Sequence, residues 1–191
     1  MKFLALQKQV NFNLFTLADI VKFFPEESDH LIRVQLSRFS QRGLIFQIKR
    51  GIYCFDQDKV SELELASILY QPSYLSLETA LNYYGLIPDI PLTVTSITPI
   101  TTKSIKTALG SFSYTKIAKS LFFGFEKVRD IESERFFNLA LLEKALLDYI
   151  YLRKFNSFSS LRLDLKLVNQ RLYQKLSYYY PKWVGKVGLN E

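Results

Sequence analysis

The hydrophobic positions of this chain are most regular in a stretch near its N-terminal end, where they follow a helical period. Ile32, Leu36 and Phe39 recur at i, i+4 and i+7, which places them on one apolar stripe of a helix. Ser28 is a good N-cap, because its hydroxyl can accept a hydrogen bond from a backbone N–H group of the first turn. Gly43 suits the left-handed residue that ends a helix. The pattern therefore predicts a helix between Ser28 and Gly43.

The pattern after this helix changes to the period of β-strands. β-branched and aromatic residues dominate two short runs, 45–48 and 52–55, and Lys49-Arg50-Gly51 lies between them. Two such runs joined by a glycine-containing connection predict a short hairpin. Its tip would carry two cations.

A helix with a cationic outer face, followed at once by a cation-tipped hairpin, is typical of a winged helix-turn-helix. The helix can enter the DNA major groove, which is about 12 Å wide, and the hairpin tip can contact phosphate. Residues 28–55 carry five cations against one carboxylate, so we expect double-stranded DNA as the partner. The simpler alternative is a helix–hairpin unit with solvated charges. The residues that we expect at DNA are His30, Arg33, Ser37, Arg38, Gln41, Arg42, Lys49 and Arg50.

Two further helices are predicted before this one, at residues 2–10 and 17–24. Thr16 is a cap candidate for the second of them, and Pro25 ends it. Three helices and a hairpin thus fit within residues 1–58, which we predict to be a winged helix-turn-helix domain.

The remainder, residues 59–191, predicts a second domain that mixes helices and strands, so the expected fold class is α+β. Helices are predicted at 62–69, 77–84 (with Ser76 as its cap and Gly85 at its end), 141–153 and 158–179. Strands are predicted at 93–98, 112–117, 121–128 (with a turn near Gly124) and 136–139, and residues 101–109 as a short helix or a loop.

The predicted last helix, which Pro181 would end, is basic and amphipathic. Residues 153–191 carry eight cations against two carboxylates. This charge could extend a DNA footprint or face an acidic partner or RNA, and a solvated helix face is the simplest interpretation.

Composition narrows the function further. The chain of 191 residues is 48% hydrophobic and has 16 phenylalanines and 12 tyrosines, so it can bury a core and is not disordered. No apolar run approaches the roughly 20 residues that span a bilayer, and we expect a cytoplasmic protein with no membrane partner. A single cysteine with a single histidine cannot form an internal disulfide or a structural zinc site. The net charge of +7 favours a polyanion or an acidic protein as partner.

Candidate catalytic residues are few. The sequence has no Walker loop, no G-x-G-x-x-G and no metal-spaced His/Cys set, so we expect no enzymatic activity, no cofactor and no metal. Glu78, Glu143 and Asp148 could in principle hold Mg²⁺ as in a nuclease. We favour the simpler interpretation, polarity on helix surfaces and at caps. Lys144 and Asp148 are spaced i, i+4 and should face each other.

Four segments together resemble a known family. They are R-G-I-Y (50–53), Y-L-S-L-E-T-A-L-N-Y-Y-G-L-I-P (74–88), G-S-F-S-Y (110–114) and L-E-K-A-L-L-D-Y-I-Y (142–151). In the order and spacing of these segments the chain resembles the AbiEi-type antitoxins, which are transcriptional regulators of type IV toxin–antitoxin systems. Leu142 stands where that family usually has a proline before Glu-Lys-Ala.

This resemblance implies a winged helix-turn-helix domain followed by a mixed α/β antitoxin domain, with a role in phage defence. The first domain would bind inverted repeats in the promoter of its own operon and repress it. The second would counteract a nucleotidyltransferase-like toxin without a stable complex, and its motif residues here are Glu78, Thr79, Glu143, Lys144 and Asp148. The alternative is a winged-helix regulator with no toxin, whose second domain binds a ligand or dimerises. The oligomeric state stays open, with a monomer in solution as one option.

Overall fold

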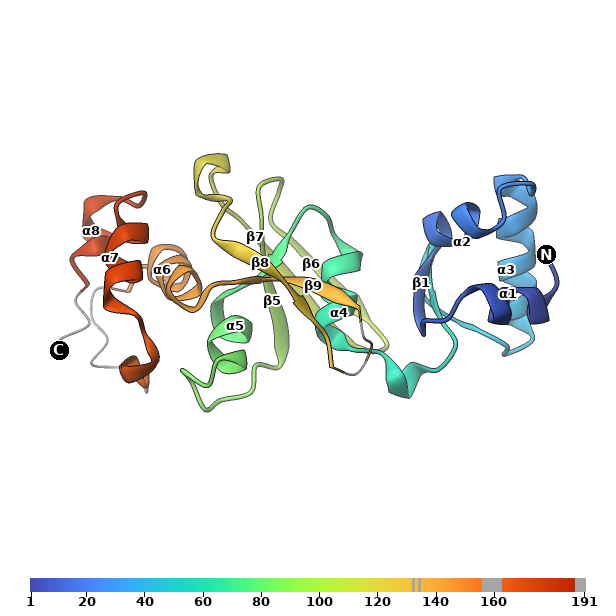
Figure 1. Cartoon of the computed structure of the whole chain (residues 1–191), viewed down its shortest axis with the longest axis horizontal. Helices are drawn as coiled ribbons and strands as arrows, with labels where there is room; N and C mark the ends of the chain where they lie inside the picture. Colours follow the sequence, from blue (N-terminus) through green and yellow to red (C-terminus); the bar gives the residue numbers. More distant parts are fainter. Residues whose placement is uncertain (132, 134, 156–162, 188–191) are drawn as a thin grey trace. The chain divides into compact units, whose positions relative to one another are not determined.

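A computed structural model describes residues 1–131, 133, 135–155 and 163–187 of the chain (Figure 1). The described residues form helices and two β-sheets, which confirms the α+β class. The chain divides into two compact units. The first comprises Met1–Leu65, Thr107–Leu109 and Asp130–Arg135, and the second comprises Ala66–Lys106, Gly110–Arg129 and Phe136–Glu191. A domain boundary between residues 58 and 59 stays a prediction.

The first unit packs helices onto a three-stranded sheet. Its elements are α1 (Phe3–Gln9), β1 (Leu14–Thr16), α2 (Leu17–Phe23), α3 (Asp29–Gln41), β2 (Phe46–Lys49), β3 (Ile52–Cys54) and the 3-10 helix η1 (Gln57–Lys59). The strand order is β1-β3-β2, and both pairings are antiparallel. The predicted helices and the predicted hairpin are confirmed. The pattern did not predict β1, whose three residues are too few to show a period.

Local sequence signals set the ends of α2 and α3. Thr16 and Asp19 form a capping box, in which the Thr16 hydroxyl accepts from the Asp19 N–H and the Asp19 carboxylate accepts from the Thr16 N–H. The Ser28 hydroxyl accepts from the backbone N–H of Leu31 and so caps α3. The apolar stripe of α3 lies in the hydrophobic core, as predicted.

The second unit is built on a six-stranded mixed sheet with the order β6-β7-β5-β4-β9-β8. Its strands are β4 (Tyr74–Leu75), β5 (Thr93–Thr98), β6 (Lys103–Thr107), β7 (Gly110–Lys116), β8 (Phe125–Arg129) and β9 (Phe136–Ala140). Its helices are α5 (Leu77–Tyr83), η2 (Lys119–Leu121), α6 (Leu142–Arg153), η3 (Leu165–Leu167), α7 (Gln170–Ser177) and α8 (Lys182–Gly185), and α4 (Glu62–Leu69) spans the division between the units. The β5–β7 and β4–β9 pairs are parallel, whereas β4–β5 and β8–β9 are antiparallel. α6 packs against α5, α7 and α8 (Figure 1).

Two predictions for the central part of this unit need correction. Residues 101–109 are expected as a short helix or a loop, but they contain β6, in which Ile105 is the only buried residue among exposed polar neighbours. With one apolar position, a strand has no visible alternation. Residues 121–128, expected as one strand, divide into the end of η2 and β8, with the expected turn at Gly124, whose φ is +72°.

The predicted long helix at 158–179 is wrong in its described part, while residues 156–162 lie outside the described residues. The chain forms η3 and then α7, because the Asn169 side chain accepts from the Leu172 N–H and starts a new helix at residue 170. Pro181, predicted to end this helix, does not do so: α7 ends at Ser177, and Pro181 is the N-cap residue of α8.

Candidate nucleic-acid interface and buried polar clusters

The outer face of α3 presents residues that we expect at DNA. The buried side chains of this helix, Ile32, Leu36 and Phe39, all lie on its other side. Arg42 follows the helix as its exposed C-cap residue. The exposed candidates on the helix itself are His30, Arg33, Ser37, Arg38 and Gln41.

The β2–β3 hairpin ends in a two-residue loop, because Lys49 pairs with Ile52 and leaves Arg50-Gly51 between them. Gly51 has a φ of +83°, a conformation that glycine adopts without strain. The Gly51 carbonyl accepts a hydrogen bond of 2.8 Å from the backbone N–H of Leu17 and so fixes the tip to the start of α2. At this tip Arg50 is exposed and Lys49 is half-buried.

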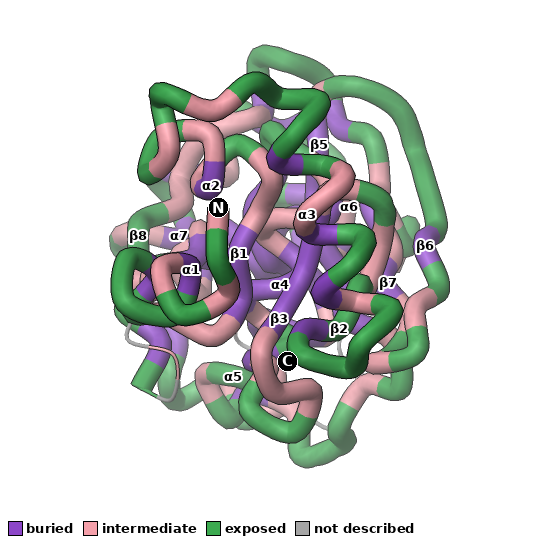
Figure 2. Tube along the Cα trace, turned by 90° about the vertical axis from the view of Figure 1, so that its right-hand side faces the viewer, coloured by how far each residue is buried: buried purple, intermediate pink, exposed green. Residues whose placement is uncertain are grey.

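The hairpin and α3 are physically coupled. Phe39 of α3 and Tyr53 of β3 lie in the same hydrophobic core. Burial raises the pKa of the Tyr53 hydroxyl, and the positive charge of Arg33 opposes this shift. β3 is buried along its length, whereas β2 is exposed to half-buried and forms an edge of the sheet (Figure 2). The eight predicted DNA-binding residues therefore lie on or directly after two elements that share one core.

The second unit buries an ion pair between Lys144 and Asp148, one turn apart on α6. The Lys144 Nζ donates to Asp148 Oδ1 at 2.5 Å, as the i, i+4 spacing predicts, and both side chains are fully buried. The Tyr180 hydroxyl donates to the same oxygen at 2.5 Å, and those of Tyr74 and Ser76 donate to Oδ2, each at 3.0 Å. These donors replace the hydration that a buried carboxylate loses.

Aromatic rings complete the surroundings of the Lys144 ammonium. Its Nζ donates to the Tyr74 hydroxyl at 2.8 Å and lies 5.2–5.4 Å from the ring centroids of Tyr74, Phe123 and Tyr180. Rings at such distances attract a cation through their negative faces. Gly124 lies against the Lys144 stem, where an added Cβ would come within 3.1 Å of Cγ. This close approach and the positive φ both favour glycine at the turn before β8.

Burial favours the neutral forms of the titratable groups in this cluster. It lowers the pKa of Lys144 and raises the pKa of Asp148, and in each case the opposite charge of the partner counteracts the shift. Burial and the Asp148 charge both raise the pKa values of the Tyr74 and Tyr180 hydroxyls. Both tyrosines therefore remain protonated donors at neutral pH.

The other predicted residues of the second unit connect separate elements. Glu78 of α5 forms a two-bond ion pair with Arg153 at the end of α6, at 2.9 Å to Nε and 3.0 Å to Nη2. The Thr79 hydroxyl accepts from the backbone N–H of Thr95 in β5 at 2.8 Å. The Glu143 carboxylate accepts a hydrogen bond of 2.8 Å from the backbone N–H of Asn169, just before α7. These contacts fasten α5, α6, β5 and α7 together.

Two interpretations of these residues are therefore wrong. Glu143 and Asp148 are buried rather than on a helix surface, as is Lys144. Tyr74 of β4 and Tyr180 after α7 contact Asp148, and the backbone just before α7 contacts Glu143. Ser76 does not cap α5 with its side chain, since its hydroxyl donates to Asp148. Glu78, Glu143 and Asp148 do not converge, and the described residues contain no group of three or more His, Cys, Asp or Glu side chains that could hold a metal ion.

The sequence pattern did not identify Tyr74, Phe123 and Tyr180 as partners of the ion pair. Tyr74 lies within one of the quoted segments, but nothing there distinguishes it from ordinary core tyrosines. Tyr180 follows two exposed tyrosines in a run of three, and only the end of α7 turns it inward. One argument could have indicated the two tyrosines: a buried Lys–Asp pair needs hydrogen-bond donors for its carboxylate, and tyrosine hydroxyls can supply them.

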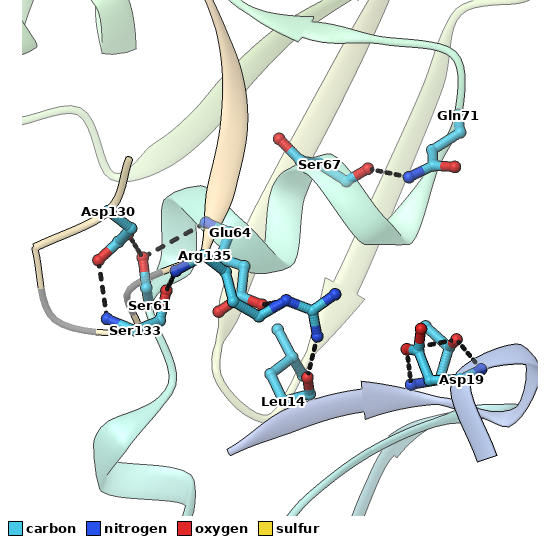
Figure 3. Close-up of polar contacts among 10 residues, drawn as sticks. Leu14, Asp19, Ser61, Glu64, Ser67, Gln71, Asp130, Ser133 and Arg135 are labelled. Carbon is cyan, nitrogen blue, oxygen red and sulfur yellow. Dashed lines mark hydrogen bonds and ion pairs between the residues drawn. The ribbon is translucent and has the colours of Figure 1, made fainter. Parts of the chain in front are cut away.

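A further polar cluster lies within the first unit around Arg135 (Figure 3). The guanidinium donates to the Leu14 carbonyl at 2.8 Å and lies 3.3 Å from a carboxylate oxygen of Glu64. It also lies over the ring of Phe12, 4.3 Å from the centroid. Burial raises the pKa of the Glu64 carboxyl, and the Ser133 hydroxyl and the Arg135 charge counteract this shift.

The segment that presents Arg135 is fixed at its other end by Asp130. The Ser61 hydroxyl donates to the Asp130 carboxylate, which also accepts from the Ser133 N–H at 3.1 Å (Figure 3). Residues 130–135 connect β8 to β9 along the chain but pack with the first unit.

These features define an α+β protein with a cationic helix–hairpin surface in one unit and a buried ion-pair cluster in the other. No protein-family model matches the chain, and no curated protein matches it. Among the helices that the structure describes, none has the length and apolar character needed to cross a bilayer.

Proposed function

We propose that the first unit is a winged helix-turn-helix that binds double-stranded DNA, with α3 as the recognition helix and the β2–β3 hairpin as the wing. The observation that carries the proposal is the position of the cations: they are exposed on α3 and at the tip of a hairpin that shares its core. The element order α1-β1-α2-α3-β2-β3 supports it, because a helix-turn-helix followed by a hairpin has this order.

The residues have distinct roles in this proposal. Arg33, Ser37, Arg38 and Gln41 approach base edges, because they lie on the exposed face of α3. Arg50 contacts phosphate from the hairpin tip, where the Gly51–Leu17 hydrogen bond holds the backbone. Lys49, His30 and Arg42 flank these positions and add to the contact with the DNA backbone.

DNA fragments from upstream of the gene, titrated with the full chain, test this proposal by fluorescence anisotropy. Arg33→Ala should lose about 1–3 kcal/mol of discrimination for the preferred sequence, since one bidentate base contact supplies that much. Arg50→Ala should weaken all duplexes alike and reduce the slope of log K against log salt by about 0.9. Lys8→Ala removes an exposed cation from α1 and should change neither quantity. Unchanged affinity in the Arg33→Ala/Arg50→Ala double variant would overturn the proposal.

We also propose that the chain is an antitoxin of the AbiEi type, which represses its own operon in the cytoplasm and counteracts a nucleotidyltransferase-like toxin without being an enzyme. The support is the four segments of the sequence and the way two of them meet. Tyr74 and Ser76 belong to the segment 74–88, and Lys144 and Asp148 belong to the segment 142–151. These four residues of the two segments thus form one buried cluster. The fold therefore needs both segments together.

Co-expression with the neighbouring gene tests the antitoxin proposal. The neighbouring product should arrest growth, and this chain should relieve the arrest. The Arg33→Ala/Arg50→Ala variant should lose repression of a promoter reporter but keep this relief, because toxin neutralisation belongs to the second unit. A neighbouring product that is harmless, or toxicity that this chain does not relieve, would leave a DNA-binding regulator without a toxin.

A further inference from the structure

The last part of the described chain has an unusual charge composition. Residues 165–187 contain no aspartate or glutamate. All the cations of this stretch are exposed: Lys166, Arg171, Lys175, Lys182 and Lys186. α7 and α8 therefore form a uniformly positive part of the second unit.

Large aromatic side chains are exposed among these cations. Tyr178 is 88% exposed, Tyr179 is 58% exposed and Trp183 is 38% exposed. Tyr173 and Tyr180, from the same stretch, are buried, so α7 and the residues after it have an inner and an outer set of rings. The inner set completes the core, whereas each ring of the outer set keeps a part of its surface exposed.

The outer rings and the cations are arranged together. Arg171, Lys175 and Tyr178 recur at i, i+4 and i+7, which places them on one exposed face that runs to the end of α7. α8 packs against α7 and begins with Lys182 and Trp183 (Figure 1). Other rings hold two of these aromatic side chains in place. Trp183 stacks on Tyr151 at 6.2 Å, and the Tyr179 ring meets Phe123 edge to face at 4.9 Å.

We propose that α7 and α8 form a binding surface for single-stranded nucleic acid. The outer rings stack on unpaired bases, and the lysines and Arg171 contact the phosphates. A duplex fits this surface less well, because its bases are already stacked on one another and offer no free face to Tyr178. An acidic protein would satisfy the cations but would leave the flat faces of the rings unused. The proposal does not depend on the proposed function of the first unit, since it concerns other residues.

The single tryptophan of the chain is a local reporter for this surface. Titrating the full chain with oligo(dT) or oligo(rU) should quench the fluorescence of Trp183, because a base that stacks on the indole quenches it. The Arg33→Ala/Arg50→Ala variant should show the same quenching, which separates this surface from the one on α3. If only one of the two oligonucleotides quenches, the surface distinguishes the thymine and deoxyribose of the first from the uracil and ribose of the second, and the proposal still holds.

Two substitutions probe the two kinds of contact. Tyr178→Ala should weaken oligonucleotide binding roughly 5- to 150-fold, the range expected for the loss of one stacked base. Tyr83→Ala, which removes a half-exposed ring from α5, is the matched control and should leave the affinity unchanged. Lys175→Ala and Lys182→Ala should each reduce the salt slope by about 0.7, the value for one phosphate of a single strand. Lys127→Ala, which removes an exposed cation from β8, should leave the salt slope unchanged.

Several results would overturn the proposal. They are an unquenched Trp183, an unchanged affinity for Tyr178→Ala, and equal quenching by a duplex of the same length, which would indicate an extended double-stranded footprint. A Trp183 signal that responds to anionic lipid vesicles but not to either oligonucleotide would indicate a membrane surface instead.

Discussion

At the scale of single residues, the chemistry of the second unit is concentrated in Lys144 and Asp148. Their mutual contact could be predicted from the i, i+4 spacing, because it lies within one helix. Their burial could not, because the groups that cover them come from elsewhere in the chain. Tyr74 is 74 residues from Asp148 in sequence, and Tyr180 is 32 residues away. No periodicity within α6 contains that information.

The ion pair predicts a strong dependence of stability on the presence of both charges. Lys144→Met should reduce the free energy of unfolding by about 3–5 kcal/mol, because it leaves a buried carboxylate without its cation. Lys144→Met/Asp148→Leu should be less destabilised than the sum of the two single variants, since no charge then remains, although three hydroxyls still lose their acceptor. Urea denaturation of the four proteins measures these differences.

The Glu78–Arg153 pair is the matched control, because both of its side chains are partly exposed. Glu78→Gln should cost less than about 1 kcal/mol, as surface pairs do. Additive losses for Lys144→Met and Asp148→Leu would contradict the account of the buried pair.

At the scale of elements, local signals predicted the first unit well. Caps at Thr16 and Ser28, the stripe of α3 and the glycine of the hairpin each act within a few residues of one another. The failures lie where neighbouring elements decide the outcome. β6 is a strand because it pairs with the edge of a sheet, and α7 starts at residue 170 because Asn169 caps it.

The end of α6 offers a test of backbone strain. Lys154 follows this helix in the left-handed conformation, with a φ of 57°, and its side chain is exposed. Lys154→Gly should raise the free energy of unfolding by about 0.5–1 kcal/mol. The left-handed conformation costs a residue with a Cβ roughly 1–2 kcal/mol, and glycine loses part of that gain through a more disordered unfolded chain.

Thermal unfolding of Lys154→Gly and Lys154→Ala separates strain from charge. The alanine variant keeps its Cβ, so its melting temperature should stay at or below that of the natural chain. An equal rise in both variants would attribute the effect to the lost positive charge.

At the scale of the whole molecule, the first unit is not built from one continuous piece of chain. Residues 130–135 belong to it by packing, and Arg135 is the residue through which they bind Leu14, Glu64 and Phe12. No sequence pattern around Arg135 or around its partners indicates these contacts, because a single arginine in a polar loop resembles any exposed cation. This part of the fold was therefore beyond prediction from sequence.

Removing the Arg135 side chain should destabilise the first unit. Arg135→Ala leaves the buried Glu64 carboxylate without its cation, and we expect a loss of about 1–3 kcal/mol in the free energy of unfolding. Trp183 fluorescence, followed during urea unfolding, reports on the second unit alone, whereas far-UV circular dichroism reports on both units, so a shift in circular dichroism without a shift in fluorescence assigns the loss to the first unit. Glu64→Leu/Arg135→Ala should recover part of the loss, and Lys127→Ala should cause none. A transition displaced only at Trp183 would show that Arg135 stabilises the second unit instead.

The position of residues 130–135 in the chain also has a consequence for biosynthesis. Leu14 and Glu64 leave the ribosome well before Arg135. The Glu64 carboxylate of the nascent N-terminal segment therefore has no Arg135 partner until the β8–β9 connection emerges. A nascent chain stalled before that point would hold its first unit incomplete and more open to proteases. The proposed DNA-binding unit would then become able to bind DNA only late in translation, after most of the polypeptide has been made.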